Sequence, residues 1–135
     1  MINTTMDKAL AGTLSYSPEH DLYLIRDNAV VLYIGITTQH ITDRLFRHID
    51  NGSLIGLAIL LNTPESNRWS VDLLSPVDVV PGLDTATAEK YLIRSRRPLF
   101  NGTYNPDDNC GSDLYRHYLR RGSLFQNNVA GRVGL

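Results

Sequence analysis

The sequence predicts a small α+β domain built on a three-stranded antiparallel or mixed sheet flanked by helices. Two short apolar runs, Leu22–Ile25 and Val30–Ile34, are separated by four polar or small residues, a spacing typical of a β-hairpin. A third, mostly alternating run covers Arg68–Ser75, and helix signals precede and follow that run. At 135 residues one domain is the default expectation.

Composition indicates a globular protein of the cytoplasm. Hydrophobic residues make up 42% of the chain and charged residues 20%, which excludes a disordered polymer. The longest apolar run, Leu54–Leu61, is too short to cross a bilayer, which takes about 20 residues. We see no signal peptide and expect no membrane partner. The only cysteine, Cys110, excludes an internal disulfide and a cysteine-based zinc site, and a reducing cytoplasm fits it.

The basic charge is concentrated in the last third of the chain. Residues 1–88 hold five Lys/Arg and ten Asp/Glu, whereas residues 89–135 hold eight and four, so the two segments carry −5 and +4. Such a patch could follow the phosphates of a nucleic acid, or it could be a solvated helix face. Its arginines are Arg94, Arg96, Arg97, Arg116, Arg120 and Arg121.

Residues 1–18 are weakly patterned, and we treat them as an N-terminal extension. A short amphipathic helix would place Met6, Ala9, Leu10 and Leu14 on one face. Ser15–Pro18 reads as a loop that leads into the first strand.

The hairpin, about Asp21–Ile36, carries one tyrosine on each strand. Because side chains alternate between faces, Tyr23 and Tyr33 can converge on one side of the sheet. The alternative is that both are ordinary strand tyrosines. Gly35 ends the second strand, where glycine allows a bend or a close approach.

A helix should follow the hairpin and end at Asn51-Gly52. Thr37-Thr38 could begin it by capping, with Thr38 or Thr42 as the alternative caps. Arg44 and His48 lie one turn apart beside its apolar stripe, so both could point towards the tyrosines. The stripe consists of Ile41, Leu45 and Ile49.

Two further helices are predicted. Leu54–Leu61 favours a buried helix, with a strand as the alternative. Thr85–Arg97 should begin at an Asp84 cap and end before Pro98. In that helix Glu89 shares the side of Leu92 and Ile93, where a carboxylate is costly unless it is paired or binds a metal. The alternative is an edge glutamate held by Arg96 or Lys90.

Residues 105–135 form a predicted basic C-terminal extension. Within it, Leu114–Arg121 reads as a short helix that interleaves tyrosines with arginines. Such a helix could contact nucleic acid by stacking and charge, or simply pack on the domain.

An ordered set of these residues resembles the GIY-YIG nuclease family, which includes UvrC-type excision nucleases and catalytic domains of homing and restriction endonucleases. The YIG half matches fully and the GIY half is degenerate, with Asp21 in place of the family's glycine. The resemblance spans about residues 19–104. It rests on Tyr23, Tyr33-Ile34-Gly35, Arg44-x-x-x-His48, Glu89 and Asn101.

The resemblance implies a metal-dependent endonuclease that hydrolyses phosphodiester bonds, with DNA as the expected partner. Glu89 matches the ligand of Mg²⁺, for which Mn²⁺ can substitute, and Arg44 matches the phosphate-binding arginine. Of the paired tyrosines, Tyr23 is favoured as the base, and His48 matches a histidine that assists proton transfer or binds phosphate. The residues expected to contact substrate are Asn101, Gly35, Thr37, Arg96, Arg97, Arg116 and Arg120; Asn101 could instead be structural.

These residue types suit that chemistry. Arginine donates two hydrogen bonds to phosphate and stays charged, and a single carboxylate can hold Mg²⁺, which keeps most of its waters. Ile36 stands where some members have a lysine, so one cation is missing. Two other functions remain open, a non-cleaving nucleic-acid-binding module and an interaction domain whose site residues are structural. Single-stranded, double-stranded and branched DNA and RNA are all compatible with these residues.

Overall fold

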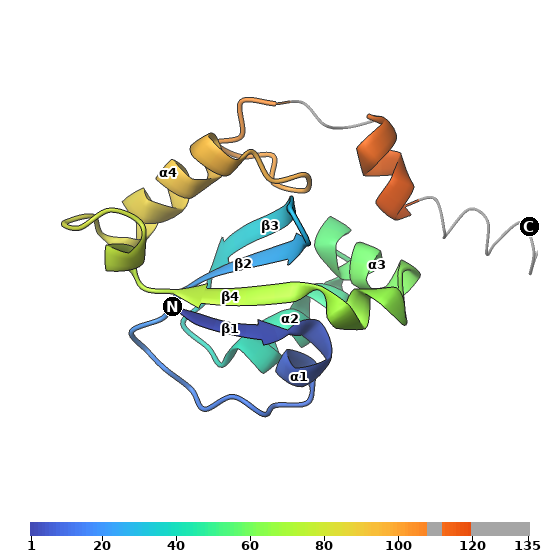
Figure 1. The fold of residues 1–135 in the computed structure, drawn as a ribbon, viewed down its shortest axis with the longest axis horizontal. Coiled ribbons are helices and arrows are strands. Elements are labelled where there is room, and N and C mark those ends of the chain that lie inside the picture. The colour runs from blue at the N-terminus through green and yellow to red at the C-terminus, as the bar shows by residue number, and fades with distance from the viewer. Residues whose placement is uncertain (108–111, 120–135) are drawn as a thin grey trace, which may run out of the picture.

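A four-stranded antiparallel sheet in the order β1-β4-β2-β3 forms the centre of the fold (Figure 1). The structure, a computed structural model, describes residues 1–107 and 112–119. The α+β class is confirmed, but the expectation of three strands is wrong, because the N-terminal residues add an edge strand. The strands are β1 (Ile2–Thr5), β2 (Leu22–Asp27), β3 (Val30–Ile36) and β4 (Ser70–Leu74).

The predicted hairpin is β2 and β3, joined by the two-residue turn Asn28-Ala29. Asn28 adopts φ 52°, a left-handed conformation that asparagine tolerates better than most residues. The register places Tyr23 directly opposite Gly35, and a bulge falls between Ile25 and Arg26. The tyrosine of β2 therefore faces a residue without a side chain.

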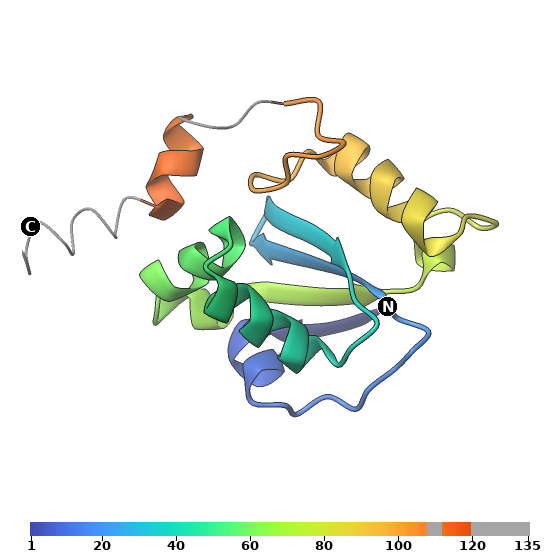
Figure 2. The same ribbon diagram turned by 180° about the vertical axis from the view of Figure 1, so that it is seen from behind.

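Three helices cover one face of the sheet: α1 (Met6–Leu10), α2 (Ile41–Asn51) and α3 (Leu54–Leu61) (Figure 2). Leu54–Leu61 is thus helical, as favoured. The N-terminal helix ends at Leu10, so Leu14 lies outside it. Gly52 ends α2 at φ 67°, the left-handed conformation expected of Asn51-Gly52. The core under these helices takes alternate strand residues, among them Tyr23, Ile25, Val71 and Leu73.

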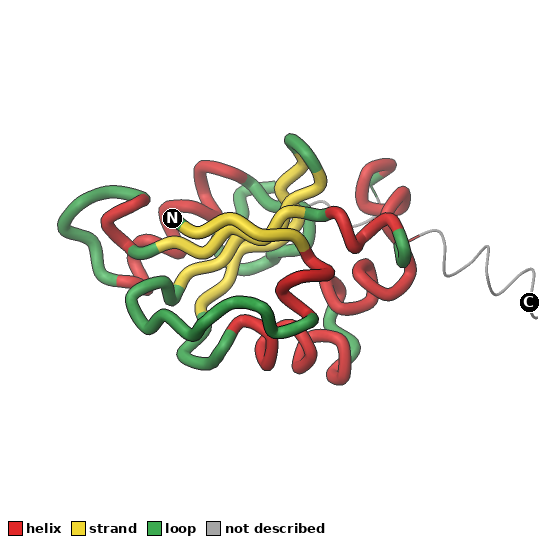
Figure 3. The backbone as a smooth tube through the Cα atoms, turned by 60° about the horizontal axis from the view of Figure 1, so that its bottom comes forward, coloured by secondary structure: helices red, strands yellow, loops and turns green. Residues whose placement is uncertain are grey.

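The fourth helix, α4 (Thr85–Arg96), packs on the opposite face, so helical segments lie on both sides of the sheet (Figure 3). Its buried residues join the intervening strand positions Leu22, Leu24 and Leu74. Asp84 caps α4 by accepting a hydrogen bond of 2.7 Å from the Thr87 N–H, as predicted. Arg97 ends it with φ 49°, one residue before Pro98.

The chain after α4 runs along the free edge of β3. The N–H groups of Leu99 and Phe100 donate to the carbonyls of Val31 (3.0 Å) and Leu32 (2.9 Å). This pairing satisfies backbone groups that an edge strand would otherwise expose. It also fixes α4 beside β3.

Residues 113–119 form a helix that contacts the hairpin and α3. The Tyr118 hydroxyl donates to Asp27 (2.8 Å), and the Asn62 side chain donates to the Tyr118 carbonyl (2.7 Å). Arg120, Arg121 and Cys110 lie outside the described residues. No helix within residues 1–107 and 112–119 has both the length and the apolar character needed to cross a membrane.

Candidate active site

The two tyrosines of the hairpin lie side by side on the face covered by α2. The ring centroids of Tyr23 and Tyr33 are 6.0 Å apart, as the alternation of strand residues predicted. A Cβ on Gly35 would lie 2.5 Å from both Cζ and the hydroxyl oxygen of Tyr23, far inside contact distance. Gly35 is therefore needed because the Tyr23 ring lies across it.

Two side chains of α2 reach the Tyr23 hydroxyl. Arg44 Nε donates to the hydroxyl oxygen at 3.3 Å, and His48 Nε2 lies 2.7 Å from the same oxygen. The ring of His48 also meets that of Tyr33 nearly edge-on, with centroids 5.1 Å apart. The one-turn spacing of Arg44 and His48 thus brings a cation and an imidazole together at the tyrosine pair.

The cap of α2 is His40, so the expected cap at Thr37-Thr38 or Thr42 is wrong. His40 Nδ1 accepts from the Thr42 N–H at 3.1 Å, while Nε2 contacts the Leu14 carbonyl. Nδ1 serves as the acceptor of the cap, so Nε2 is the nitrogen that donates to the Leu14 carbonyl. The N-terminal loop is thereby tied to the start of the helix that carries Arg44.

Hydrogen bonds fix the form of His48. Ser53 Oγ donates to the His48 carbonyl at 3.3 Å, so at 2.9 Å from Nδ1 it acts as the acceptor. Nδ1 therefore carries the proton, and Nε2 accepts the hydroxyl hydrogen of Tyr23. The same Ser53 oxygen caps α3 through the Gly56 N–H at 3.2 Å. Tyr23 is thus a donor to a neutral imidazole.

Burial sets the protonation states of this cluster. It lowers the pKa of His48 to about 4, and the charge of Arg44 adds to the shift. Burial likewise raises the pKa of Tyr23, helped by Tyr33, and raises the pKa of Tyr33. Burial acts to lower the pKa of Arg44, but the hydrogen bond to Tyr23 and nearby acidic groups raise it on balance. Near neutral pH the site holds a neutral histidine, two phenols and a guanidinium.

The charge of Glu89, on α4, acts on Tyr23, Tyr33 and Arg44. Glu89 is half-buried, and burial raises its pKa although Arg44 and Lys90 act to lower it. Within the part of the chain that the structure describes, no hydrogen bond or salt bridge holds its carboxylate. Among the described residues neither Arg96 nor Lys90 forms a salt bridge with Glu89, although the charge of Lys90 acts on the carboxylate.

A divalent cation fits Glu89 as a single protein ligand. The described residues hold no group of three or more His, Cys, Asp or Glu side chains placed to share a metal. Mg²⁺ does not need such a group, because it is commonly held by one or two carboxylates together with water and phosphate oxygens. A half-buried carboxylate without a protein partner matches that requirement.

Asp21 is a site residue that sequence reasoning missed. Its Oδ2 accepts from the Thr85 hydroxyl at 2.6 Å, and its carbonyl accepts from the Thr37 N–H at 2.8 Å. Oδ1 is buried and, among the described residues, without a hydrogen-bond partner. Asp21 precedes Tyr23 by two residues and Thr85 precedes Glu89 by one turn. The bond therefore ties the strand of the tyrosine to the helix of the carboxylate.

Two predicted substrate contacts are already engaged within the fold. The Asn101 side chain accepts from the Ile34 N–H and donates to the Ile34 carbonyl, both at 2.9 Å. This supports the structural alternative for Asn101, since it extends the pairing along the edge of β3. Thr37 is buried, and its hydroxyl donates to and accepts from the Gln39 backbone at 3.0 Å.

Two of the predicted arginine contacts are already paired with aspartates. Arg97 forms a salt bridge with Asp107 (3.1 Å) and Arg116 with Asp113 (2.9 Å), whereas Arg96 is exposed on α4. Arg120 lies outside the described residues. A role for these arginines in substrate binding stays a prediction.

Comparison of the chain with protein-family models, with curated proteins and with solved structures gives no match. The chemistry of the site must therefore follow from its own residues.

Proposed function

We propose that this chain is a metal-dependent endonuclease that hydrolyses phosphodiester bonds in DNA, as its resemblance to the GIY-YIG nucleases implies. The observation that carries the proposal is that side chains from separate elements come together at the tyrosine pair. Tyr23, Tyr33, Arg44 and His48 meet from β2, β3 and α2, and the charge of Glu89 on α4 acts on Tyr23, Tyr33 and Arg44. A phosphate here would meet a cation, a carboxylate and two phenols.

Arg44 is assigned to the scissile phosphate. Its guanidinium stays charged, and only Nε is engaged by Tyr23, so the two terminal nitrogens remain for phosphate oxygens. Charge-assisted hydrogen bonds of this kind stabilise the extra negative charge of the transition state.

The tyrosines have different roles in this proposal. Tyr23 is completely buried, and its hydroxyl already binds Arg44 and His48, so it positions those two side chains. Tyr33 is only half-buried, which makes it the better candidate to contact the attacking water. We therefore move the base from Tyr23, favoured from the sequence, to Tyr33.

The proton balance is simple. As a phenolate, Tyr33 takes one proton from water while the water oxygen bonds to phosphorus and the leaving oxygen departs with a proton from solvent. Burial makes the phenolate scarce, and the charge of Arg44 favours it. Glu89 would hold Mg²⁺ or Mn²⁺, which when bound supplies positive charge to the phosphoryl and leaving oxygens.

The proposal is tested by cleavage of supercoiled plasmid, single-stranded DNA and a branched duplex, in Mg²⁺, Mn²⁺ or EDTA. The wild type should cut at least one substrate, and only with metal. Glu89→Gln should lose cleavage, whereas Glu19→Gln, the same change at an exposed loop residue, should retain it. Salt-dependent binding without any cleavage would instead support the non-cleaving binding module. A protein that neither binds nor cleaves nucleic acid would support the interaction domain.

A further inference from the structure

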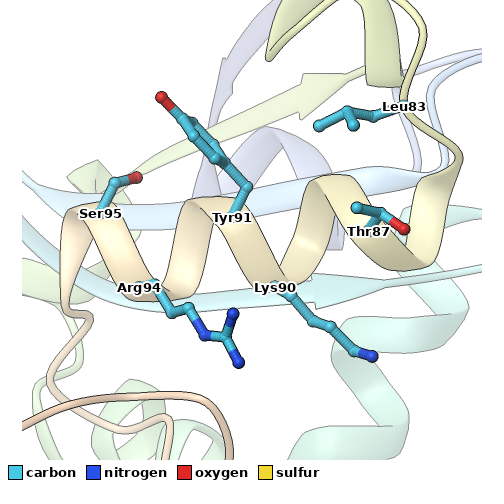
Figure 4. A pocket seen from close by; sticks show the side chains of 6 residues that line it. All are labelled: Leu83, Thr87, Lys90, Tyr91, Arg94 and Ser95. Carbon is cyan, nitrogen blue, oxygen red and sulfur yellow. The ribbon is translucent and has the colours of Figure 1, made fainter.

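A shallow groove of about 390 Å³ runs over the outer face of α4, away from the sheet. Figure 4 shows Tyr91 and Ser95 on one side of the helix, with Lys90 and Arg94 on the other. The aromatic wall, Tyr91, and the cationic wall, Lys90 and Arg94, thus project to opposite sides of the exposed face of one helix (Figure 4). The lining residues are Leu83, Thr87, Lys90, Tyr91, Arg94 and Ser95.

The cationic wall is held in place and is not neutralised by an ion pair. Lys90 Nζ lies 5.0 Å from the centre of the Tyr104 ring, and Arg94 Cζ lies 6.0 Å from it. These cation–π contacts orient both side chains but leave their charges available to an anion. In residues 1–107 and 112–119 neither cation forms a salt bridge.

The aromatic wall is open to solvent. Tyr91 is 51% exposed in the middle of α4, while the core side of the helix is filled by Ala88, Leu92 and Ile93. Packing of the domain therefore does not explain this tyrosine. An exposed ring beside cations is the arrangement with which proteins bind single nucleic-acid strands, stacking a base and pairing the backbone.

We propose that this groove binds one strand of a nucleic acid, with a base stacked on Tyr91 and phosphates on Lys90 and Arg94. The choice of ligand rests on the proposed function, and the position of the groove agrees with it. Lys90 follows Glu89 directly, and its charge acts on the Glu89 carboxylate. A strand leaving the groove at Lys90 would arrive beside Glu89, so the groove would hold the substrate next to the scissile phosphate.

The test is a binding measurement in EDTA, where no cleavage occurs. The probe is a fluorescein-labelled single-stranded oligonucleotide of mixed sequence, titrated by anisotropy between 50 and 200 mM salt, on the order of the range over which phosphate contacts are resolved. Tyr91→Ala should weaken binding by roughly 5- to 150-fold, the range for one lost stacking contact, and Tyr91→Phe should not.

Removal of the two cations should change the salt dependence. Lys90→Gln with Arg94→Gln should reduce the slope of log affinity against log salt by about 1.4, because each single-strand phosphate contact contributes about 0.7. The control is Arg68→Gln, an exposed arginine before β4, which should leave the slope unchanged. All the substituted side chains lie on the surface, and circular dichroism checks that each variant is folded.

Each outcome separates the groove from the nuclease. If the wild type binds the oligonucleotide through the groove but cleaves no substrate, the binding proposal stands and the nuclease proposal is rejected. If Tyr91→Ala and the Lys90→Gln/Arg94→Gln variant both bind as tightly as the wild type, the groove is not the binding site, even if the protein cleaves DNA. The assignment to nucleic acid would also be overturned if the wild type did not bind the oligonucleotide. It would be overturned as well if poly-glutamate bound equally tightly and Tyr91→Ala did not change that binding.

Discussion

Gly35→Ala is the sharpest single test of how the two tyrosine strands fit together. The added Cβ would lie 2.5 Å from Tyr23 Cζ, whereas ordinary contacts of this kind are 3.4–4 Å. The ring must therefore move by about 1 Å or the strands must separate. Because Tyr23 is completely buried, the ring has no free space to enter.

The expected cost is that of overpacking a core, about 1–3 kcal/mol in the free energy of unfolding. For a domain of this size that lowers the melting temperature by roughly 4–12 °C. The same movement disturbs the 2.7 Å hydrogen bond between Tyr23 and His48. If the site cleaves DNA, a displacement of about 1 Å should slow it on the order of a hundredfold.

The assay is a double-mutant cycle in which urea denaturation measures the free energy of unfolding of each variant. Gly35→Ala is measured alone and with Tyr23→Leu, which removes the ring that the new methyl group would meet. The destabilisation by Gly35→Ala should shrink by about 1–3 kcal/mol in the Tyr23→Leu background. Gly102→Ala is the matched control, since a Cβ there has no neighbour within 4 Å.

Two results would refute the reasoning. Gly35→Ala could be as stable as the wild type, or its cost could add to that of Tyr23→Leu without coupling. Either would mean that the Tyr23 ring does not lie across Gly35.

Three further predictions concern the supports of the site. His48 stays neutral in the fold with a pKa of about 4, against about 6.5 when unfolded, so the unfolded chain binds more protons in between. The free energy of unfolding should fall by up to about 3 kcal/mol as pH drops from about 6.5 to 4. In urea titrations His48→Gln should flatten this dependence on pH, and an unchanged dependence would contradict the role of His48. Thr85→Val should cost about 1–3 kcal/mol in thermal denaturation, because it removes the hydrogen-bond donor of the half-buried Asp21 carboxylate, and a wild-type melting curve would exclude that role. Asn101→Ala should speed amide exchange at Ile34, whose N–H it binds at 2.9 Å, and unaltered protection would remove Asn101 as a support of β3.

The sequence was sufficient for elements with strong local signals. The hairpin followed from two apolar runs around a short turn, and α4 from the Asp84 cap and Pro98. The convergence of Tyr23 and Tyr33 followed from strand alternation alone. Each of these inferences uses residues near one another in the chain.

The features that the sequence did not indicate depend on contacts between residues that are far apart in the chain. The strand β1 has four residues and forms because Ile2 pairs with Leu73, far along the chain. The bond between Asp21 and Thr85 joins residues 64 positions apart and needs the return of α4 to the sheet. Tyr23 lies on β2 inside the sheet and Tyr33 on the last strand, β3, and no local pattern encodes this difference in burial.

The most direct test of the active-site proposal is single-turnover cleavage of the best substrate by variants that keep the fold. Tyr33→Phe, Arg44→Lys and Glu89→Gln should each be at least about a hundredfold slower than the wild type, while Glu19→Gln is unchanged. Wild-type rates in all three variants would contradict the account and assign any observed cleavage to another nuclease in the preparation.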